Sequence, residues 1–178
     1  YFFKFYFSED VQKDLQAPLL GHLPHIEAFK DLRLEKKSIL DLLKKDKDKD
    51  EDQSKRDSYQ RFFFQEAFRN LYTSIRFLDT TQEVKTIILS SSLPKEGKTL
   101  INILLAKTIA DLGVKILLID ADMRKPQIHY RLGLNNLLGF SNLLIDPKIK
   151  ISQVVNKIKN YENWSVITGG TIPPDPSR

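Results

Sequence analysis

The feature that most constrains the fold is the turn SSSLPKEGKT at residues 90–99, which lies between two apolar segments. The preceding segment, 84–89, is predicted to be a strand, and the following one, 99–112, a buried helix that ends at Gly113. A turn that leads from a strand into a helix directs backbone N–H groups toward one point, where the helix dipole also favours an anion. The sequence therefore predicts a phosphate-binding loop.

Three residues of this loop have the chemistry that a nucleotide phosphate requires. Gly97 lets the backbone approach closely, Lys98 is expected to reach the β- and γ-phosphates, and the Thr99 hydroxyl would complete a magnesium shell. Ser92 stands where the motif G-x-x-x-x-G-K-[ST] has its first glycine. The residues expected to bind the nucleotide are Ser92, Pro94, Lys95, Glu96, Gly97, Lys98, Thr99 and Leu100.

A second apolar segment, 115–119, is predicted to be a strand and is followed by Asp120 and Asp122. Ligands of parallel α/β sheets bind at the carboxyl edge of the strands, which places both carboxylates beside the phosphate loop. Asp120 could hold a magnesium-bound water or accept a proton from an attacking hydroxyl, and Asp122 could position the metal or the acceptor. The simpler alternative, that both aspartates cap the turn, stays open.

Strands that are apolar on both faces and alternate with a buried helix indicate an α/β P-loop domain. The predicted sheet is mostly parallel and flanked by helices on both faces. Further helices are predicted near 141–145 and 151–159, and a further strand near 164–167.

The charged segment 44–57 divides the chain into an N-terminal arm, 1–43, and the main domain, 58–178. It holds six basic and six acidic residues and no apolar one, which predicts a solvated linker, with a helical extension stabilised by i,i+4 pairs as the alternative. The aromatic run at 1–7 is either a frayed or edge segment or an interfacial membrane anchor.

Composition narrows the classes of function. Lys and Arg total 28 and Asp and Glu 23, a net charge of +5 that is compatible with an anionic ligand but gives no reason to expect nucleic acid. The chain has no cysteine, which excludes disulfide scaffolds, thiolate zinc sites and cysteine nucleophiles.

The segment 60–78 is predicted to be a helix, because its apolar residues recur every three or four positions. These residues are Phe64, Phe68, Leu71, Ile75 and Leu78. Glu66, Arg69 and Arg76 share another face, where they either keep the helix soluble or pair with a neighbouring subunit.

Two motifs together resemble the bacterial tyrosine kinases, cytoplasmic domains of membrane proteins that regulate capsular and exopolysaccharide chain length. They are S-x-x-P-x-E-G-K-[ST] at 91–99 and LLIDADxRKP at 117–126, and the resemblance extends over 8–178. Leu93 stands where chromosome-partitioning ATPases of related type carry an additional lysine. The third motif of the family would lie beyond Arg178, so we expect the P-loop domain to be incomplete at its C-terminus.

The resemblance implies an autophosphorylating, ATP-dependent protein tyrosine kinase that regulates polysaccharide synthesis and export. It assigns Lys98, Asp120 and Asp122 to catalysis, and Thr99 with the same two aspartates to Mg²⁺. It also assigns Glu66 and Arg69 to self-association through an E-x-x-R-x-x-R helix, in which Tyr72 takes the third position here.

The resemblance further implies ATP, tyrosine-containing proteins and a transmembrane activator or polysaccharide co-polymerase segment as partners, at the cytoplasmic face of the bacterial inner membrane. Two alternatives remain, an ATPase switch of the chromosome-partitioning type and a nucleotide-binding assembly module without turnover.

Overall fold

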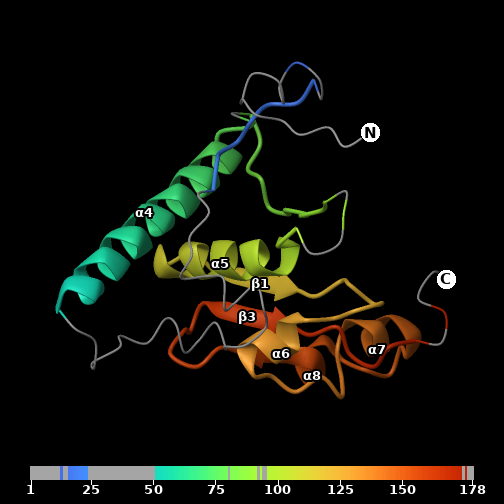
Figure 1. The fold of residues 1–178 in the computed structure, drawn as a ribbon. Coiled ribbons are helices and arrows are strands. Elements are labelled where there is room, and N and C mark those ends of the chain that lie inside the picture. The colour runs from blue at the N-terminus through green and yellow to red at the C-terminus, as the bar shows by residue number, and fades with distance from the viewer. Residues whose placement is uncertain are drawn as a thin grey trace.

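The structure is a computed structural model that describes residues 13, 16–23, 51–79, 81–91, 93, 96–173 and 175, with side chains in the first long helix described from residue 62 (Figure 1). Most of the predicted arm 1–43 lies outside the described residues. The same holds for three residues of the predicted phosphate loop, Ser92, Pro94 and Lys95.

Two long helices, α4 (Glu51–Arg76) and α5 (Lys98–Asp111), lie on one side of the sheet (Figure 1). From α4, Phe68 and Ile75 are buried in the core, as the apolar periodicity predicts. The buried residues of α5 are Leu100, Ile103, Leu104, Leu105, Ala106, Ile109 and Ala110. The core extends from α4 and α5 through the sheet to Ile128 and Leu132 on its other side. The predicted helix at 99–112 is confirmed.

The described sheet has three strands in the order β1-β3-β2, formed by β1 (Ile116–Ile119), β2 (Val155–Lys157) and β3 (Trp164–Ile167). β1 and β3 are parallel, whereas β2 and β3 are antiparallel. The sheet is thus mixed where the sequence predicts a mostly parallel one.

Three short helices lie on the other side of the sheet, α6 (Ile128–Leu132), α7 (Phe140–Ile145) and α8 (Ile151–Val154) (Figure 1). The α/β class with helices on both faces is therefore confirmed. The predicted helix at 141–145 and strand at 164–167 are confirmed as well.

The strand predicted at 84–89 is wrong for this structure, because the segment forms no strand pairing. Val84 and Leu89 pack against the core, but Ile88 is 88% exposed. An apolar segment forms a strand only when a neighbouring strand satisfies its backbone N–H and C=O groups. In the described sheet β1 pairs with β3 alone, so the segment 84–89 is not paired with the other edge of β1.

The helix predicted over 151–159 is correct only in its first turn. α8 ends at Val154, and Val155 begins β2, where it pairs with Ile167. A β-branched residue has little helix preference, and pairing with the buried strand β3 decides its conformation.

The charged segment is helical over its last seven residues, 51–57, since α4 begins at Glu51. For these residues the structure shows the helix that the alternative of a helical extension expects. Among the described residues, no helix is both long and apolar enough to cross a bilayer.

Candidate functional site: the loop before α5 and the carboxyl edge of the sheet

The N-terminus of α5 lies at the carboxyl end of β1 (Figure 1). Gly97 caps the helix with φ 96°, a left-handed conformation that favours glycine, and its carbonyl accepts the first helical hydrogen bond from Ile101 N at 2.9 Å. The N–H groups of residues 98–100 precede that bond and are available to an anion. Leu100 contributes only its backbone to such a site, because its side chain is buried in the core.

The side chain of Lys98 ties the two ends of the loop together. Its Nζ donates hydrogen bonds to Ser91 Oγ at 2.6 Å and to the Leu93 carbonyl at 3.3 Å. Glu96 Oε2 accepts a third bond from Leu93 N at 3.1 Å. The ammonium group, predicted to bind phosphate, is thus held beside the helix start by the loop itself.

Asp120 follows β1 directly and is 5% exposed. Its Oδ2 accepts hydrogen bonds from Gln127 N and Ile128 N, both at 3.0 Å, and its Oδ1 accepts one from Asp122 N at 3.3 Å. Burial raises the pKa of Asp120, while the three N–H donors act in the opposite direction. The side chain is therefore a fixed, buried carboxyl group with a heightened affinity for a proton.

Asp122 is exposed and closes the turn that follows β1. Its Oδ1 accepts hydrogen bonds from Arg124 N at 3.2 Å and Lys125 N at 2.9 Å. Both aspartates thus perform the turn-capping role that the sequence left open. Within the described part of the chain, no three His, Asp or Glu side chains gather in an arrangement suited to a metal ion.

The sequence did not predict a second group of polar residues at the carboxyl edge. Asn136 pairs with both backbone groups of Gly170, donating from Nδ2 to its carbonyl at 2.8 Å and accepting from its N–H at 2.9 Å. Asn142 Nδ2 donates to Thr171 Oγ1 at 2.8 Å, and its Oδ1 accepts from Thr171 N at 3.2 Å. The start of α7 is thereby fixed to the segment after β3.

The two chain segments at this point approach so closely that only glycine fits. A Cβ atom on Gly139 would lie 2.3 Å from Gly170 N and from the Thr168 carbonyl oxygen. The sequence contains glycine in both segments, NNLLGFSN and TGGT, but neither segment indicates that the two are in contact.

Glu66 and Arg69 form an ion pair along α4, and both side chains are partly exposed. An exposed i,i+3 pair contributes little to stability, so the pair remains available to a partner surface. Tyr72 is half-buried and packs against the core instead of extending this charged row.

No protein-family model matches the sequence. The chain is 37% identical over 112 residues to the tyrosine-protein kinase YwqD of Bacillus subtilis, a match that covers 63% of this chain and 46% of YwqD. It is also 37% identical over 112 residues to the tyrosine-protein kinase Wzc of Salmonella typhimurium, of which the match covers 15%. The matched part of the chain is homologous to bacterial tyrosine kinases.

A solved structure resembles this chain beyond the matched 112 residues. The crystal structure of the chimerical protein CapA2B2 is 28% identical, with a TM-score of 0.69 that covers 96% of this chain and 63% of that one. The chain spans less than half the length of YwqD and a smaller part of Wzc.

Proposed function

We propose that the chain is the nucleotide-binding part of a protein tyrosine kinase that transfers the γ-phosphoryl group of ATP to tyrosine hydroxyls. The observation that carries the proposal is the position of Lys98, at the start of α5 and at the carboxyl end of β1, where Asp120 and Asp122 follow. Phosphoryl transfer needs mainly positioning and charge neutralisation, which these residue types supply.

The residues present fit a magnesium nucleotide by their donor chemistry. Lys98 and the N–H groups of 98–100 would hold the phosphates, together with the remaining predicted loop residues, Ser92 and 94–97. The Thr99 hydroxyl and the carboxylates of Asp120 and Asp122 are hard oxygen ligands, the kind that Mg²⁺ prefers. When bound, Mg²⁺ neutralises charge on the phosphate oxygens.

Asp120 would accept the proton of the attacking tyrosine hydroxyl. Its backbone hydrogen bonds hold the carboxyl group in one orientation, and a pKa raised by burial brings it closer to that of an effective base at neutral pH. Asp122, exposed at the turn, would position the metal or the acceptor.

We further propose that the chain associates with itself through the helix face of Glu66 and Arg69. In this proposal it acts with a transmembrane activator or polysaccharide co-polymerase segment at the cytoplasmic face of the inner membrane, and its substrates are tyrosine-containing proteins. The relatives YwqD and Wzc bear the name of tyrosine-protein kinases, which supports tyrosine-containing proteins as the substrate class.

The test is label transfer from γ-labelled MgATP to the protein, followed by phosphoamino-acid analysis and equilibrium binding of the nucleotide. We expect phosphotyrosine from the wild type and neither transfer nor tight binding from Lys98→Met. Lys115→Met, which removes an exposed lysine at the opposite end of β1, is the matched control and should behave as the wild type. Release of inorganic phosphate without phosphotyrosine would replace the kinase proposal with that of an ATPase switch.

A further inference from the structure

Exposed apolar side chains gather around α7. Among the described residues, nine large apolar or aromatic side chains are at least 60% exposed, and five of these lie between positions 137 and 172. The five are Leu137, Leu144, Ile145, Ile151 and Ile172. Apolar side chains that are grouped on a surface mark a place where another molecule or a membrane is bound. The surroundings of α7 are therefore a candidate contact surface.

A hydrogen bond holds the segment after β3 against α7. The Thr171 carbonyl accepts this bond from Ser141 Oγ at 2.6 Å. Leu144 and Ile145 follow Ser141 by three and four positions, so they lie one turn further along the same side of the helix. Ile172, the neighbour of Thr171, therefore adjoins the side of α7 that carries these two residues.

Lysine side chains follow in the turn from α7 to α8. Lys148 and Lys150 are exposed, and neither forms an ion pair with a described residue. Asp146 is the one acidic residue of the sequence between positions 137 and 160, and its Oδ1 accepts a hydrogen bond from Lys148 N at 2.9 Å. The same stretch contains four lysines, so it carries a net positive charge.

We define the α7–α8 patch by its exposed apolar and basic side chains, Leu144, Ile145, Lys148, Lys150, Ile151 and Ile172. Protein interfaces are enriched in aromatic residues and Arg and depleted in Lys, whereas this patch combines aliphatic residues with Lys. Aliphatic side chains beside lysines suit an anionic bilayer, because the apolar groups enter the headgroup boundary and the ammonium groups are attracted to lipid phosphates. The composition of the patch therefore favours a lipid surface over a protein partner.

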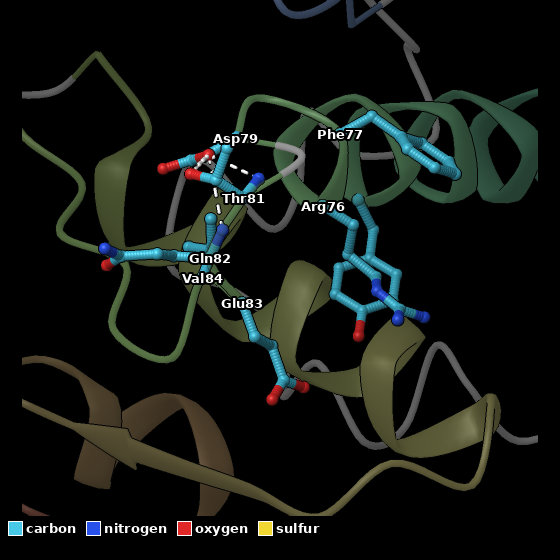
Figure 2. A pocket seen from close by; sticks show the side chains of 8 residues that line it. Arg76, Phe77, Asp79, Thr81, Gln82, Glu83 and Val84 are labelled. Carbon is cyan, nitrogen blue, oxygen red and sulfur yellow. Dashed lines mark hydrogen bonds between the residues drawn. The ribbon is translucent and has the colours of Figure 1, made fainter.

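An open pocket of about 310 Å³ at the end of α4 has a different charge pattern. Figure 2 shows Arg76 in this pocket together with Asp79 and Glu83. The two acidic groups would repel an anionic surface, whereas all charged side chains of the α7–α8 patch are cations. The pocket therefore supplies a cation against which the lysines of the patch can be compared.

We propose that the α7–α8 patch binds the surface of an anionic phospholipid bilayer, with its apolar side chains at the headgroup boundary and its two lysines beside the lipid phosphates. The contact does not depend on the proposed kinase activity. Phe140 N donates a hydrogen bond to the Thr168 carbonyl at 2.8 Å, which places α7 at the carboxyl edge of the sheet (Figure 1). The bilayer would therefore lie at the edge of the sheet that carries the candidate site.

The test is co-sedimentation of the 178-residue chain with vesicles of phosphatidylcholine and phosphatidylglycerol in equal parts, and with vesicles of phosphatidylcholine alone. We expect the wild type to bind the anionic vesicles, and the neutral ones about tenfold more weakly or less. The double variant Lys148→Gln, Lys150→Gln should bind the anionic vesicles roughly thirtyfold more weakly, because two cations leave the surface. Ile145→Ser should weaken this binding about tenfold, because an apolar side chain is lost from the contact.

Two control variants remove cations elsewhere. The double variant Lys85→Gln, Lys115→Gln makes the same charge change at two exposed lysines away from α7, and Arg76→Gln removes the cation of the pocket in Figure 2. Both should bind the anionic vesicles as the wild type does. Equal weakening by the Lys85 and Lys115 variant would show that the net charge of the chain binds the vesicles, and the proposal would be wrong.

Fluorescence measures the insertion of the apolar side chains. Trp164 is the single tryptophan of the chain and is 0% exposed, so its emission should not respond to vesicles. We expect the emission of Ile145→Trp to shift to shorter wavelengths when anionic vesicles are added, because the new indole enters the headgroup boundary. Ile88→Trp, at an exposed position away from α7, should show no such shift.

A wild type that binds neither kind of vesicle overturns the proposal, and so does vesicle binding that the variants of the patch leave unchanged. Self-association in sedimentation velocity that Ile145→Ser abolishes, without any vesicle binding, would make a second copy of this chain the occupant of the patch. Label transfer from MgATP in the absence of vesicles should be the same for the variants of the patch as for the wild type. A failure of the lipid contact is thus distinguishable from a failure of the proposed function.

Discussion

Lys98 Nζ donates a hydrogen bond of 2.6 Å to Ser91 Oγ, so Ser91, near the start of the loop, is tied to the first residue of α5. The Ser91 hydroxyl in turn donates to the Leu93 carbonyl at 2.8 Å. An ammonium group has three donors, and Lys98 uses two of them on the loop. One donor therefore remains for a phosphate oxygen while the loop stays closed.

Ser91→Ala should weaken MgATP binding. The substitution removes the hydrogen bond that positions the Lys98 ammonium group, so part of the binding free energy would be spent on ordering the loop and this group. The loss of one hydrogen bond to a charged group corresponds to about 1.5–3 kcal/mol, or roughly tenfold or more in affinity. Titration calorimetry measures the change. Ser90→Ala, at the exposed neighbouring serine, is the matched control. Tighter binding by Ser91→Ala would mean that the Ser91 hydroxyl competes with the nucleotide for Lys98.

Asp120→Asn should separate stability from activity. Burial raises the pKa of Asp120, so its contribution to stability is fully present below the ordinary aspartate pKa of about 3.9 and is lost as pH rises through the raised value. Asparagine keeps an oxygen acceptor for Ile128 N and cannot ionise. We expect Asp120→Asn to melt at or above the wild-type temperature at pH 7, and this advantage to disappear near pH 3.5, whereas label transfer from ATP is lost.

Thermal melts of both proteins from pH 3.5 to pH 7 provide the measurement. A variant that is less stable than the wild type by more than about 1 kcal/mol at pH 7 would show that the ionised carboxylate stabilises the fold through its N–H donors.

Some of these features follow from local sequence, and others depend on contacts that no local pattern contains. The strand at 164–167 was predictable, because turn residues bound its largely apolar sequence. In the structure it forms the buried strand β3. The segment 84–89 is equally apolar, but whether it pairs depends on the edge of β1. Strand preference is encoded locally, while strand pairing is decided by tertiary structure.

The same distinction applies to the candidate site. Gly97, Lys98 and Thr99 are neighbours in the chain, so their motif places them together. Asn136 and Gly170 are 34 residues apart and meet only because α7 and the segment after β3 come together at one edge of the sheet. No spacing rule joins an asparagine to a glycine at that separation.

Truncation of two isoleucines should change the stability of the protein to very different extents. Ile103→Ala should destabilise the protein by about 2–5 kcal/mol, because the side chain of Ile103, on α5, is 0% exposed in the core. Ile88→Ala should change stability by less than about 0.5 kcal/mol, since the side chain is 88% exposed. Urea unfolding measures both, with each variant serving as the control for the other. A loss above about 1 kcal/mol for Ile88→Ala would show that 84–89 is buried in solution, as a strand beside β1 would be.

Asn136→Ala should impair phosphoryl transfer without weakening nucleotide binding. Asn136 fixes both backbone groups of Gly170 at the carboxyl edge, and among the described residues it forms no hydrogen bond with the loop that holds Lys98. We expect kcat/KM for label transfer to fall by up to about thirtyfold, which corresponds to two lost hydrogen bonds of roughly 1 kcal/mol each, while the affinity for MgATP stays the same. Asn135→Ala is the matched control, because its side chain accepts a bond from Leu137 N within the same turn. If Asn136→Ala lowers MgATP affinity and transfer by the same factor, then Asn136 acts on the nucleotide site and not on the placement of the acceptor.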